Sequence, residues 1–328
     1  MILGIDISKA YFDVTVRMGP GQKTHRQFTN DEPGIAALLA WLKRQGVSDL
    51  HVCMEATNLY WEAVAEQIHE QGYTVSVVGC PRGAARIKGF AQTQLRRNKT
   101  DKQDSDVIAD FCAALKPAAW QPPSPTQRKL RALERHREAL QKTLTQQKNR
   151  LASSKDPDVI RSLQRVIDTL QQEIEQLNQQ IAAEIAQHEA LATQKALLLS
   201  IQGIGERTAH KLMTEMYDLA MYENAHAAAA DAGVTPAHHE SGATIRRPAR
   251  LSKVGKAAVR GALYWPAITA IRYNPVVRTL AQRLERQNKP AKVIIAAAMR
   301  KLIHLAYGVL KHKRPFDPNW GAQPVPAT

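Results

Sequence analysis

Four acidic residues stand where their carboxylates could bind divalent metal ions together. Asp6 ends an apolar run at the start of the chain, and Glu55 ends a second apolar run in "DLHVCMEAT". Asp101 and Asp104 lie three apart at the predicted start of a helix and therefore share one face. Carboxylates so close would repel one another without a cation, and their oxygens suit Mg²⁺ or Mn²⁺. Two such ions could polarise a scissile phosphodiester and stabilise its attacking and leaving oxygens.

Each of these acids also has a purely structural interpretation. Asp6 and Glu55 could simply end strands. Asp101 could be the N-cap of a helix whose dipole favours Asp104 in its first turn. The stretch "RRNKTDKQDSD" favours the metal interpretation, because its cations could hold a nucleic-acid backbone beside the acids. These cations are Arg96, Arg97 and Lys99.

Ser241 is the candidate nucleophile, and arginines follow it closely in the sequence. A serine hydroxyl attacks a phosphate only when a base removes its proton and cations screen the approaching charge. The base could be His238, His239 or Glu240, and the sequence leaves all three open. A Ser-Gly turn without any chemistry is the alternative interpretation of Ser241.

Positive charge is concentrated in one part of the chain. The 328 residues carry a formal net charge of +15, and the segment from Thr244 to Arg314 contains 17 Lys and Arg residues against one acid, Glu285. A field of this kind suits a polyanion, above all nucleic acid, although a solubilising surface could have the same composition. The expected phosphate contacts are Arg246, Arg247, Arg250, Lys253, Lys256 and Arg260.

A further phosphate-binding element is expected in "SIQGIGERTAHKLM". Gly203 and Gly205 are separated by one apolar residue and followed by a predicted helix, which is typical of a helix-hairpin-helix turn. Such a turn presents backbone N–H groups and a helix N-terminus to a phosphate. A plain connection between two helices explains the pattern equally well.

Strand-like and helix-like segments alternate over the first 120 residues. Apolar, β-branched runs predict strands at residues 2–7, 11–18, 49–57 and 73–79. Amphipathic runs predict helices at residues 32–46, 60–72 and 101–115. This order indicates an α/β domain in which helices cover a sheet. It ends at the linker "KPAAWQPPSP", whose prolines no helix could accommodate.

Residues 121–194 are expected to form an antiparallel coiled-coil hairpin. Apolar residues recur there at alternating spacings of four and three, as in a coiled-coil seam. They are Leu163, Ile167, Leu170, Ile174, Leu177 and Ile181. Leucines at 130, 133, 140 and 144 match less well, and "SSKDPD" predicts the turn between the helices. An ordinary helical bundle is the alternative. The hairpin could serve dimerisation, spacing or nucleic-acid binding.

Nothing in the composition favours an extracellular or membrane protein. Cys53, Cys80 and Cys112 form no CxxC pair, so neither a disulfide framework nor a zinc site is expected. We find no secretory signal and no apolar run near the ~20 residues that span a bilayer. We therefore expect a cytoplasmic protein without a membrane partner.

Six sequence blocks, taken in order, resemble the DEDD-type transposases of bacterial insertion sequences, which are serine recombinases guided by a bridge RNA. The blocks are "GIDISK", "MEATNLYW", "RNKTDKQDSD", "SIQGIGERTA", "AGVTPAHHESG" and "KVGKAAVRGALY". The resemblance covers nearly the whole chain. It implies an RNase H-like (RuvC-like) α/β domain at 1–120, the antiparallel coiled-coil hairpin at 121–194, a mostly α-helical transposase domain at 195–315 and a tail at 316–328.

The resemblance also implies a mechanism and partners. The tetrad that holds Mg²⁺ would comprise Asp6, Glu55, Asp101 and Asp104. Ser241 would attack a DNA phosphodiester and form a covalent phosphoserine. The tetrad of one subunit would act with the serine of another within dimers and tetramers. A bridge RNA would pair with double-stranded donor and target DNA, and the enzyme would work at the nucleoid in the bacterial cytoplasm.

Two other functions fit the same residues without the resemblance. A metal-dependent nuclease of the Holliday-junction type would use water as the nucleophile, release free ends and leave Ser241 without a role. A non-enzymatic scaffold would bind nucleic acid through the basic segment and the hairpin alone. A covalent protein–DNA adduct separates the recombinase from both alternatives.

Overall fold

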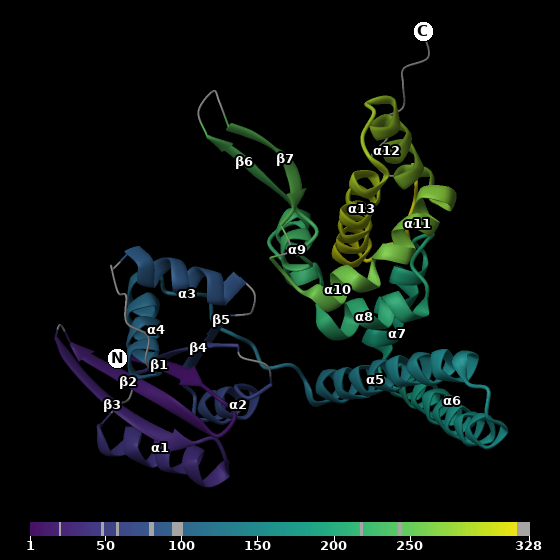
Figure 1. The fold of residues 1–328 in the computed structure, drawn as a ribbon. Coiled ribbons are helices and arrows are strands. Elements are labelled where there is room, and N and C mark those ends of the chain that lie inside the picture. The colour runs from purple at the N-terminus through teal and green to yellow at the C-terminus, as the bar shows by residue number, and fades with distance from the viewer. Residues whose placement is uncertain are drawn as a thin grey trace. The chain divides into compact units, whose positions relative to one another are not determined.

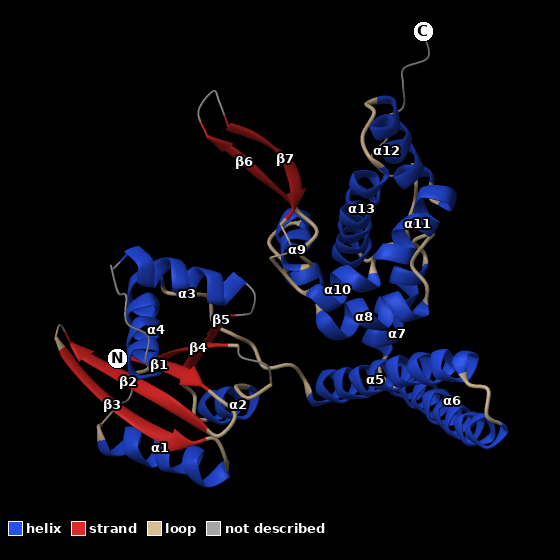
Figure 2. Cartoon of the chain, in the orientation of Figure 1, coloured by secondary structure: helices blue, strands red, loops and turns tan. Residues whose placement is uncertain are grey.

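The computed structural model describes residues 1–19, 21–46, 49–56, 59–78, 82–93, 101–216, 219–241, 245–252 and 254–319. The chain forms two compact units, Met1–Pro122 and Pro123–Thr328 (Figure 1). The first unit combines a sheet with helices, whereas helices dominate the second (Figure 2). An α/β part followed by a mostly α-helical part is the order that the sequence predicts.

A twisted sheet forms the centre of the first unit. Its strands are β1 (Ile2–Ile7), β2 (Tyr11–Gly19), β3 (Gln22–Thr29), β4 (His51–Glu55) and β5 (Thr74–Val78). The helices around it are α1 (Glu32–Arg44), α2 (Glu62–Glu70), α3 (Arg82–Thr93) and α4 (Asp101–Leu115). Within the described residues the sheet has five strands in the order β3-β2-β1-β4-β5. β1, β2 and β3 pair antiparallel, whereas β4 and β5 run parallel to β1 and to each other.

The two faces of this sheet differ in character. Side chains alternate along a strand, so Leu3 and Ile5 lie on one face, in an apolar core shared with α1 and α2. Gly4 and Thr15 lie opposite each other on the other face, which α4 covers. Because residues two apart share a face, Asp6 also belongs to the face that α4 covers.

The helix α4 lies directly on β1, and Gly4 makes this possible. A Cβ atom at Gly4 would stand 2.3 Å from the Ser105 carbonyl oxygen and 2.3 Å from the Ala109 amide nitrogen. In the same interface the buried hydroxyls of Thr15 and Ser105 share a hydrogen bond of 2.8 Å. Helix backbone therefore touches strand backbone, which fixes the height of α4 above the sheet.

Ion pairs hold one side of α4 against β2 and β3. Arg17 donates to Asp110 at 2.8 Å, and Lys23 donates to Asp110 at 3.0 Å. Lys23 also donates to Asp106. The Asp110 side chain is only 11% exposed, so solvent screens this cluster less than a surface pair. Both acids of α4 in this cluster thus have structural partners on the sheet.

The other side of α4 packs on an apolar cluster. Its members are Cys53, Val78, Ile87, Val107, Ile108, Phe111 and Cys112. Cys53 and Cys112 are buried free thiols, and Cys80 lies outside the described residues. The hydrogen bond that the Cys53 thiol donates to Cys112, together with burial, raises the pKa of Cys53. The two thiols join the strand that ends in Glu55 to the helix that carries Asp104.

Two elements of the first unit are absent from the sequence prediction. β3 reads QKTHRQFT, and Phe28 is the residue of this strand that the fold buries. The sequence of β3 lacks the apolar alternation that predicts a strand, because a strand at the edge of a sheet needs little apolar surface. α3 reads RGAARIKGFAQT, a basic segment in which Ile87 packs into the apolar cluster beneath α4. Tertiary contacts rather than periodicity define both elements.

A helical hairpin opens the second unit. α5 (Pro125–Ser153) and α6 (Pro157–Ala186) lie side by side along their length (Figure 1). Ser124 and Gln127 form a capping box at the start of α5, and the Asp156 side chain caps α6. The predicted seam residues that are buried are Leu163, Ile167, Ile174, Leu177 and Ile181. The assignment of this hairpin as a coiled coil stays a prediction.

The rest of the second unit is a helical body with a projecting β-hairpin. Its elements are α7 (Glu189–Leu199), α8 (Glu206–Glu215), the 3₁₀ helix η1 (Leu219–Met221), α9 (Ala225–Asp231), β6 (Pro236–Ser241), β7 (Ile245–Leu251), α10 (Ala257–Ala262), α11 (Tyr264–Tyr273), α12 (Pro275–Arg286) and α13 (Ala291–His312). The β6–β7 hairpin is not part of the sequence prediction, because its residues are strongly polar.

The longest helix of this body, α13, is apolar enough to resemble a membrane span. By length and composition alone its 22 residues could cross a bilayer. The sequence-based expectation that no apolar run approaches this length is therefore wrong. In the fold, α13 packs into the core of the second unit, where Leu302, Ile303 and Ala306 are fully buried.

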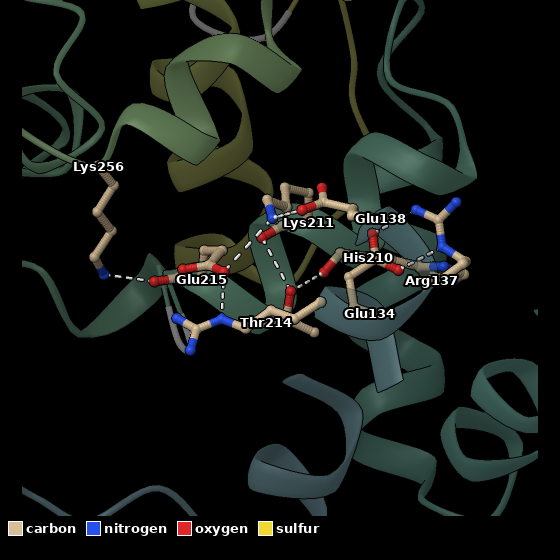
Figure 3. Close-up of polar contacts among 9 residues, drawn as sticks. Glu134, Arg137, Glu138, His210, Lys211, Thr214, Glu215 and Lys256 are labelled. Atoms are coloured by element: carbon tan, nitrogen blue, oxygen red, sulfur yellow. Dashed lines mark hydrogen bonds and ion pairs between the residues drawn. The ribbon is translucent and has the colours of Figure 1, made fainter. Parts of the chain in front are cut away.

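Buried charges fasten the α5–α6 hairpin to the helical body (Figure 3). Glu134 and Arg137 of α5 are 1% and 5% exposed, and the guanidinium donates to the carboxylate at 2.6 and 2.9 Å. Lys211 of α8 donates to Glu138 of α5 at 2.7 Å and lies 3.5 Å from Glu215. Charges this deeply buried are tolerated only when they are paired, so α5 and α8 hold one fixed register.

The pKa of Glu215 reflects this pairing. Burial alone would raise the pKa of this carboxyl, but the Lys211 and Arg135 cations outweigh burial and hold the pKa below its ordinary value. Glu215 therefore remains charged at neutral pH and binds α8 to α5 through Arg135, whose Nε donates to it at 3.3 Å.

Replacing Gly4 tests the contact between α4 and β1. Gly4→Ala should lower the unfolding free energy of the first unit by about 1–3 kcal/mol, because the new methyl group must push two backbones apart. The matched control is Gly19→Ala, whose Cβ would have only the Gln22 Oε1 atom nearby, at 3.8 Å. Urea denaturation of both variants provides the measurement, and equal midpoints would contradict the role given to Gly4.

A double-variant cycle tests the buried pair of α5. Arg137→Ala should lower the unfolding free energy by about 3–5 kcal/mol, because it leaves a buried carboxylate without its cation. Replacing both Glu134 and Arg137 by Leu should recover most of that loss. The control is Arg161→Ala, which breaks the exposed pair with Asp158 at the same i,i+3 spacing and should leave stability nearly unchanged. A double variant as unstable as Arg137→Ala would refute this account.

Two buried histidines should make the stability of the second unit depend on pH. Burial, reinforced by the Lys195 cation, lowers the pKa of His210 from 6.5 to about 4. Burial and the Arg300 cation lower the pKa of His304 equally, to about 4. The unfolded chain then binds protons between about pH 6.5 and 4 that the folded unit does not. Stability should fall as pH drops through this window, by at most about 1.4 kcal/mol per pH unit for each histidine.

Urea denaturation at pH 7, 6 and 5 measures this loss. Replacing both His210 and His304 by Leu should make the dependence on pH shallower, because the remaining titration then comes from the carboxylates. If the slope of the variant equals that of the parent protein, the two histidines do not supply the acid sensitivity.

Candidate functional site

The fold brings two of the predicted acids to adjacent strand ends. β1 and β4 run parallel, with Ile5 beside Met54, so the residues that follow in register are Asp6 and Glu55. Both side chains are half-buried, and both belong to the face covered by α4, since residues two apart along a strand share a face. Carboxyl ends of parallel strands at one edge of a sheet are a common location for sites in α/β folds.

The helix α4 brings Asp104 to the same end of the sheet. Asp110 pairs with Arg17 beside the start of β1, whereas Ser105 bonds to Thr15 further along. The helix therefore runs from the carboxyl end of β1 toward its amino end. Asp104, half-buried in the first turn, lies toward the carboxyl end, where the two strand acids also lie.

The remaining members of the predicted acidic site are only partly described. Asp101 is the first residue of α4, but its side chain lies outside the described residues, so its interpretations as N-cap and as metal ligand both stand. The three cations that precede it, Arg96, Arg97 and Lys99, lie outside the described residues altogether.

The acids suit a hard divalent cation by their chemistry and placement. Carboxylate oxygens are the ligands that Mg²⁺ and Mn²⁺ prefer, and the strand pair Asp6 and Glu55 is reached by the first turn of α4. Among the side chains that the structure describes, no group of three His, Cys, Asp or Glu is placed to hold a metal ion. The acids therefore fit such an ion by their chemistry alone, and the Asp101 side chain, the fourth predicted ligand, lies outside the described residues.

Asp13 is an additional acid beside the strand acids, and it is not among the residues predicted from the sequence. It stands directly opposite Asp6 in the β1–β2 pairing and is 6% exposed. Two side chains of β3 donate to its carboxylate, His25 from Nε2 at 2.9 Å and Gln27 at 3.0 Å. Its place in the alternation of β2 could have signalled the shared face, but its partners belong to a strand outside the prediction. Asp13 adds negative charge beside Asp6 and is held in place by β3.

The candidate nucleophile lies at the end of a strand in the second unit. Ser241 is the last residue of β6 and pairs with Ile245 of β7 across residues 242–244. Glu240 pairs with Arg246, and His239 pairs with Arg247. The side chains of these residues lie outside the described part of the chain. The hairpin extends away from α9 and the helical body (Figure 2). Ser241 is the last residue of the strand β6, which starts from that body at Pro236.

The predicted phosphate contacts divide into exposed and internally paired residues. Arg250 is exposed at the end of β7, and Arg260 is half-buried in α10. Lys256 donates to the Glu215 carbonyl oxygen at the end of α8 (Figure 3) and lies 3.2 Å from Asp231. This lysine therefore has a structural task, and its predicted contact with phosphate is untested. Lys253 lies outside the described residues.

The two glycines before α8 differ in what they do. Gly203 has a positive φ of +106°, and a Cβ there would stand 2.7 Å from the Ala270 side chain, so this turn needs glycine for packing against α11. Gly205 begins α8 as its N-cap without a side-chain cap, and a Cβ there would meet no atom within 4 Å. Glu206, paired with Lys195 at 2.8 Å, occupies the first turn. Packing thus explains Gly203, while phosphate binding at Gly205 remains a prediction.

Comparison with known proteins places both units in one family. The family model for transposases of the DEDD IS110 type matches residues 3–154. The family model "Transposase IS116/IS110/IS902 family" matches residues 195–282. The pilin gene-inverting protein of Moraxella bovis is 33% identical over 325 residues, which cover 96% of this chain and 97% of that protein. The pilin gene-inverting protein of Moraxella lacunata has the same identity and coverage.

These matches include the sheet that carries the acids and the hairpin that carries Ser241. Their agreement over nearly the full length excludes a similarity confined to one unit. The chain belongs to the IS110 family of DEDD transposases, and it is a DNA recombinase.

Proposed function

We propose that this recombinase cleaves DNA through a covalent phosphoserine formed by Ser241, with the acidic site assisting at the same phosphate. The observation that carries the proposal is the adjacency of Asp6 and Glu55 at parallel strand ends, reached by the first turn of α4. The two family matches of this chain cover both the strands that carry these acids and the hairpin that carries Ser241, which supports joining them in one reaction.

The first step exchanges one phosphate ester for another. The Ser241 oxygen forms a bond to phosphorus while the bond from phosphorus to one deoxyribose oxygen breaks. The serine proton goes to a base, for which His238, His239 and Glu240 are the candidates, and the leaving oxygen takes up a proton. In the second step a deoxyribose oxygen of another strand attacks the phosphoserine and releases the serine. The number of phosphate ester bonds is conserved, so strand exchange needs no external energy source.

The acidic site would hold Mg²⁺ or Mn²⁺ through Asp6, Glu55, Asp104 and Asp101. When bound, such ions stabilise the charge that builds up on the phosphate oxygens. The chain's own acids contribute by their fixed positions: α4 is fastened to the sheet at Gly4 and by the ion pairs of Asp110. Asp13, tied to His25, would keep the negative potential at this edge high enough to attract a cation.

Target choice is proposed to belong to a guide RNA, with double-stranded donor and target DNA as substrates. Contacts to phosphate position a nucleic acid, whereas base pairs or base-edge contacts specify its sequence. The basic segment of the second unit suits the first task. It carries 17 cations against one acid between Thr244 and Arg314. A pairing RNA would then supply the sequence information that backbone contacts lack.

Assembly as dimers and tetramers is proposed to join the acids of one subunit to the serine of another. The α5–α6 hairpin would act as an antiparallel coiled coil that positions the subunits. Its seam residues Ile167 and Ile174 pack with Leu144 between the two helices, and a second copy would pack on the surface of the hairpin that faces away from α8. The printed name of the Moraxella relatives describes inversion of a pilin gene. A recombinase that rejoins strands at two sites would perform this kind of rearrangement, acting at the bacterial nucleoid in the cytoplasm.

Trapping the covalent intermediate tests the proposal. The protein is incubated with donor DNA, the flanking noncoding RNA and Mg²⁺, and DNA-linked protein is separated under denaturing conditions. Ser241→Ala should abolish the adduct and leave DNA binding intact, whereas Ser252→Ala, a serine just beyond β7, should leave the adduct unchanged. Glu55→Gln and Asp104→Asn should reduce the adduct at least 100-fold, an order of magnitude typical for lost transition-state stabilisation.

Asp106→Asn is the matched control among the acids of α4, since Asp106 pairs with Lys23 on the sheet; its adduct should persist. Free DNA ends without an adduct, unaffected by Ser241→Ala, would establish the metal-dependent nuclease instead. Unchanged activity in the Glu55 and Asp104 variants would exclude a role for the acidic site.

A further inference from the structure

A large cavity lies at the root of the β6–β7 hairpin in the second unit. Its volume is about 910 Å³, within the range of about 300–1,000 Å³ typical of ligand pockets. The walls come from the start of β6 and the end of β7, which together form the root of the hairpin. The remaining walls come from α10, the start of α11 and the first half of α13. Figure 1 shows that the hairpin root, α10 and α13 meet in the helical body. None of the proposed catalytic residues lines this cavity.

The interior of the cavity is apolar. Aliphatic side chains from α13 form its floor, and several remain partly open to solvent: Val293, Ile295, Ala296 and Ala297. Tyr264, the first residue of α11, lies at the wall with 42% of its surface exposed. A flat aromatic ring beside small aliphatic side chains is a surface on which a nucleobase can stack.

The charge of the lining is one-sided. Four of its fifteen residues are cations, and none of the fifteen is an acid. The cations are Arg250, Arg260, Lys292 and Arg300. Arg300 is held at 2.8 Å from His226, so part of this positive charge has a fixed place. Every nucleotide brings one phosphate, and an apolar cavity flanked by cations alone complements a base and its neighbouring phosphates.

The same charge argues against a protein segment as the occupant. A peptide would have to bring acids of its own to neutralise four cations, and the basic segment of a second copy would meet repulsion. The position at the root of the hairpin further favours DNA, because Ser241 stands near the far end of the same β6 strand whose first residue, Pro236, lines the cavity.

We propose that this cavity receives one unpaired nucleobase of the DNA bound along the β6–β7 hairpin. The inference rests on one part of the proposed function, namely that the β6–β7 hairpin contacts DNA. The base leaves its stack, lies against Tyr264 over the aliphatic floor, and its flanking phosphates contact the cations of the rim. The energy of unstacking is smallest for a base that is already unpaired, so the cavity selects DNA at a bulge, mismatch or strand junction.

Binding of matched duplexes tests the proposal on the full-length protein. A fluorescent DNA duplex with a single unpaired adenine should bind about tenfold more tightly than the fully paired duplex, a factor set by stacking on one aromatic ring. Anisotropy titrations at one fixed salt concentration measure both affinities. With 2-aminopurine as the unpaired base, fluorescence should be quenched on binding, because the probe stacks on a tyrosine.

Variants of the cavity should remove the preference without weakening binding to paired DNA. Tyr264→Ala removes the stacking ring and Ala297→Leu fills the floor, so each should bring the ratio of affinities close to one. Tyr264→Phe keeps the ring and should keep the preference. Tyr273→Ala, at the other end of α11 and 59% exposed, and Ala258→Leu, exposed on α10, lie outside the lining and should retain it.

The outcomes separate this proposal from the catalytic one. A preference for the unpaired base that survives both Tyr264→Ala and Ala297→Leu would overturn it. A preference found only with RNA duplexes would overturn it as well, as would a change in oligomeric state in the cavity variants with the preference intact. If no Ser241 adduct forms but the preference depends on Tyr264, the cavity stands and the serine mechanism falls.

Discussion

The backbone contact between α4 and β1 is the constraint on which the acidic site depends. Because Gly4 has no side chain, the Ser105 carbonyl and the Ala109 amide approach the strand closely, and the first turn of α4 is held over the carboxyl ends of β1 and β4. The two sides of the helix are secured differently, by ion pairs to β2 and β3 and by apolar packing near β4. A helix bound on both sides cannot roll, so its acids keep their direction relative to the strand acids.

The two units differ in the sign of the charges that they concentrate. Acids of the first unit gather at one sheet edge, where Asp13 reinforces Asp6, whereas cations of the second unit spread from β7 to α13. Not every charge in these groups faces a ligand. Asp106 and Asp110 hold α4 against the sheet, Lys256 donates to the last carbonyl of α8, and Glu134 pairs with Arg137 within α5. Position in the fold, rather than residue type, separates a structural charge from one that can meet nucleic acid.

The elements that could be predicted from the sequence are those whose own residues show a regular apolar spacing. β1, β4 and the long helix α6 show regular spacing, and the strand-end positions of Asp6 and Glu55 follow from it. β3 and the β6–β7 hairpin escaped prediction because their sequences are rich in polar residues and show no clear apolar alternation, although each strand pairs with its neighbour in the chain. The partners of Asp13 escaped for the same reason. The cavity beside Tyr264 is built from residues that range from Val234 to Arg300 along the chain, and no spacing rule connects them.

The cations of α13 have a consequence during synthesis, before any core exists. By length and composition alone, the nascent helix resembles a membrane span before it packs into the core. Arg300 and Lys301 stand near the middle of its 22 residues, where each charge opposes insertion by about 3 kcal/mol. The two charges that interrupt the apolar sequence of α13 therefore also oppose its insertion into a bilayer before the core of the second unit has formed.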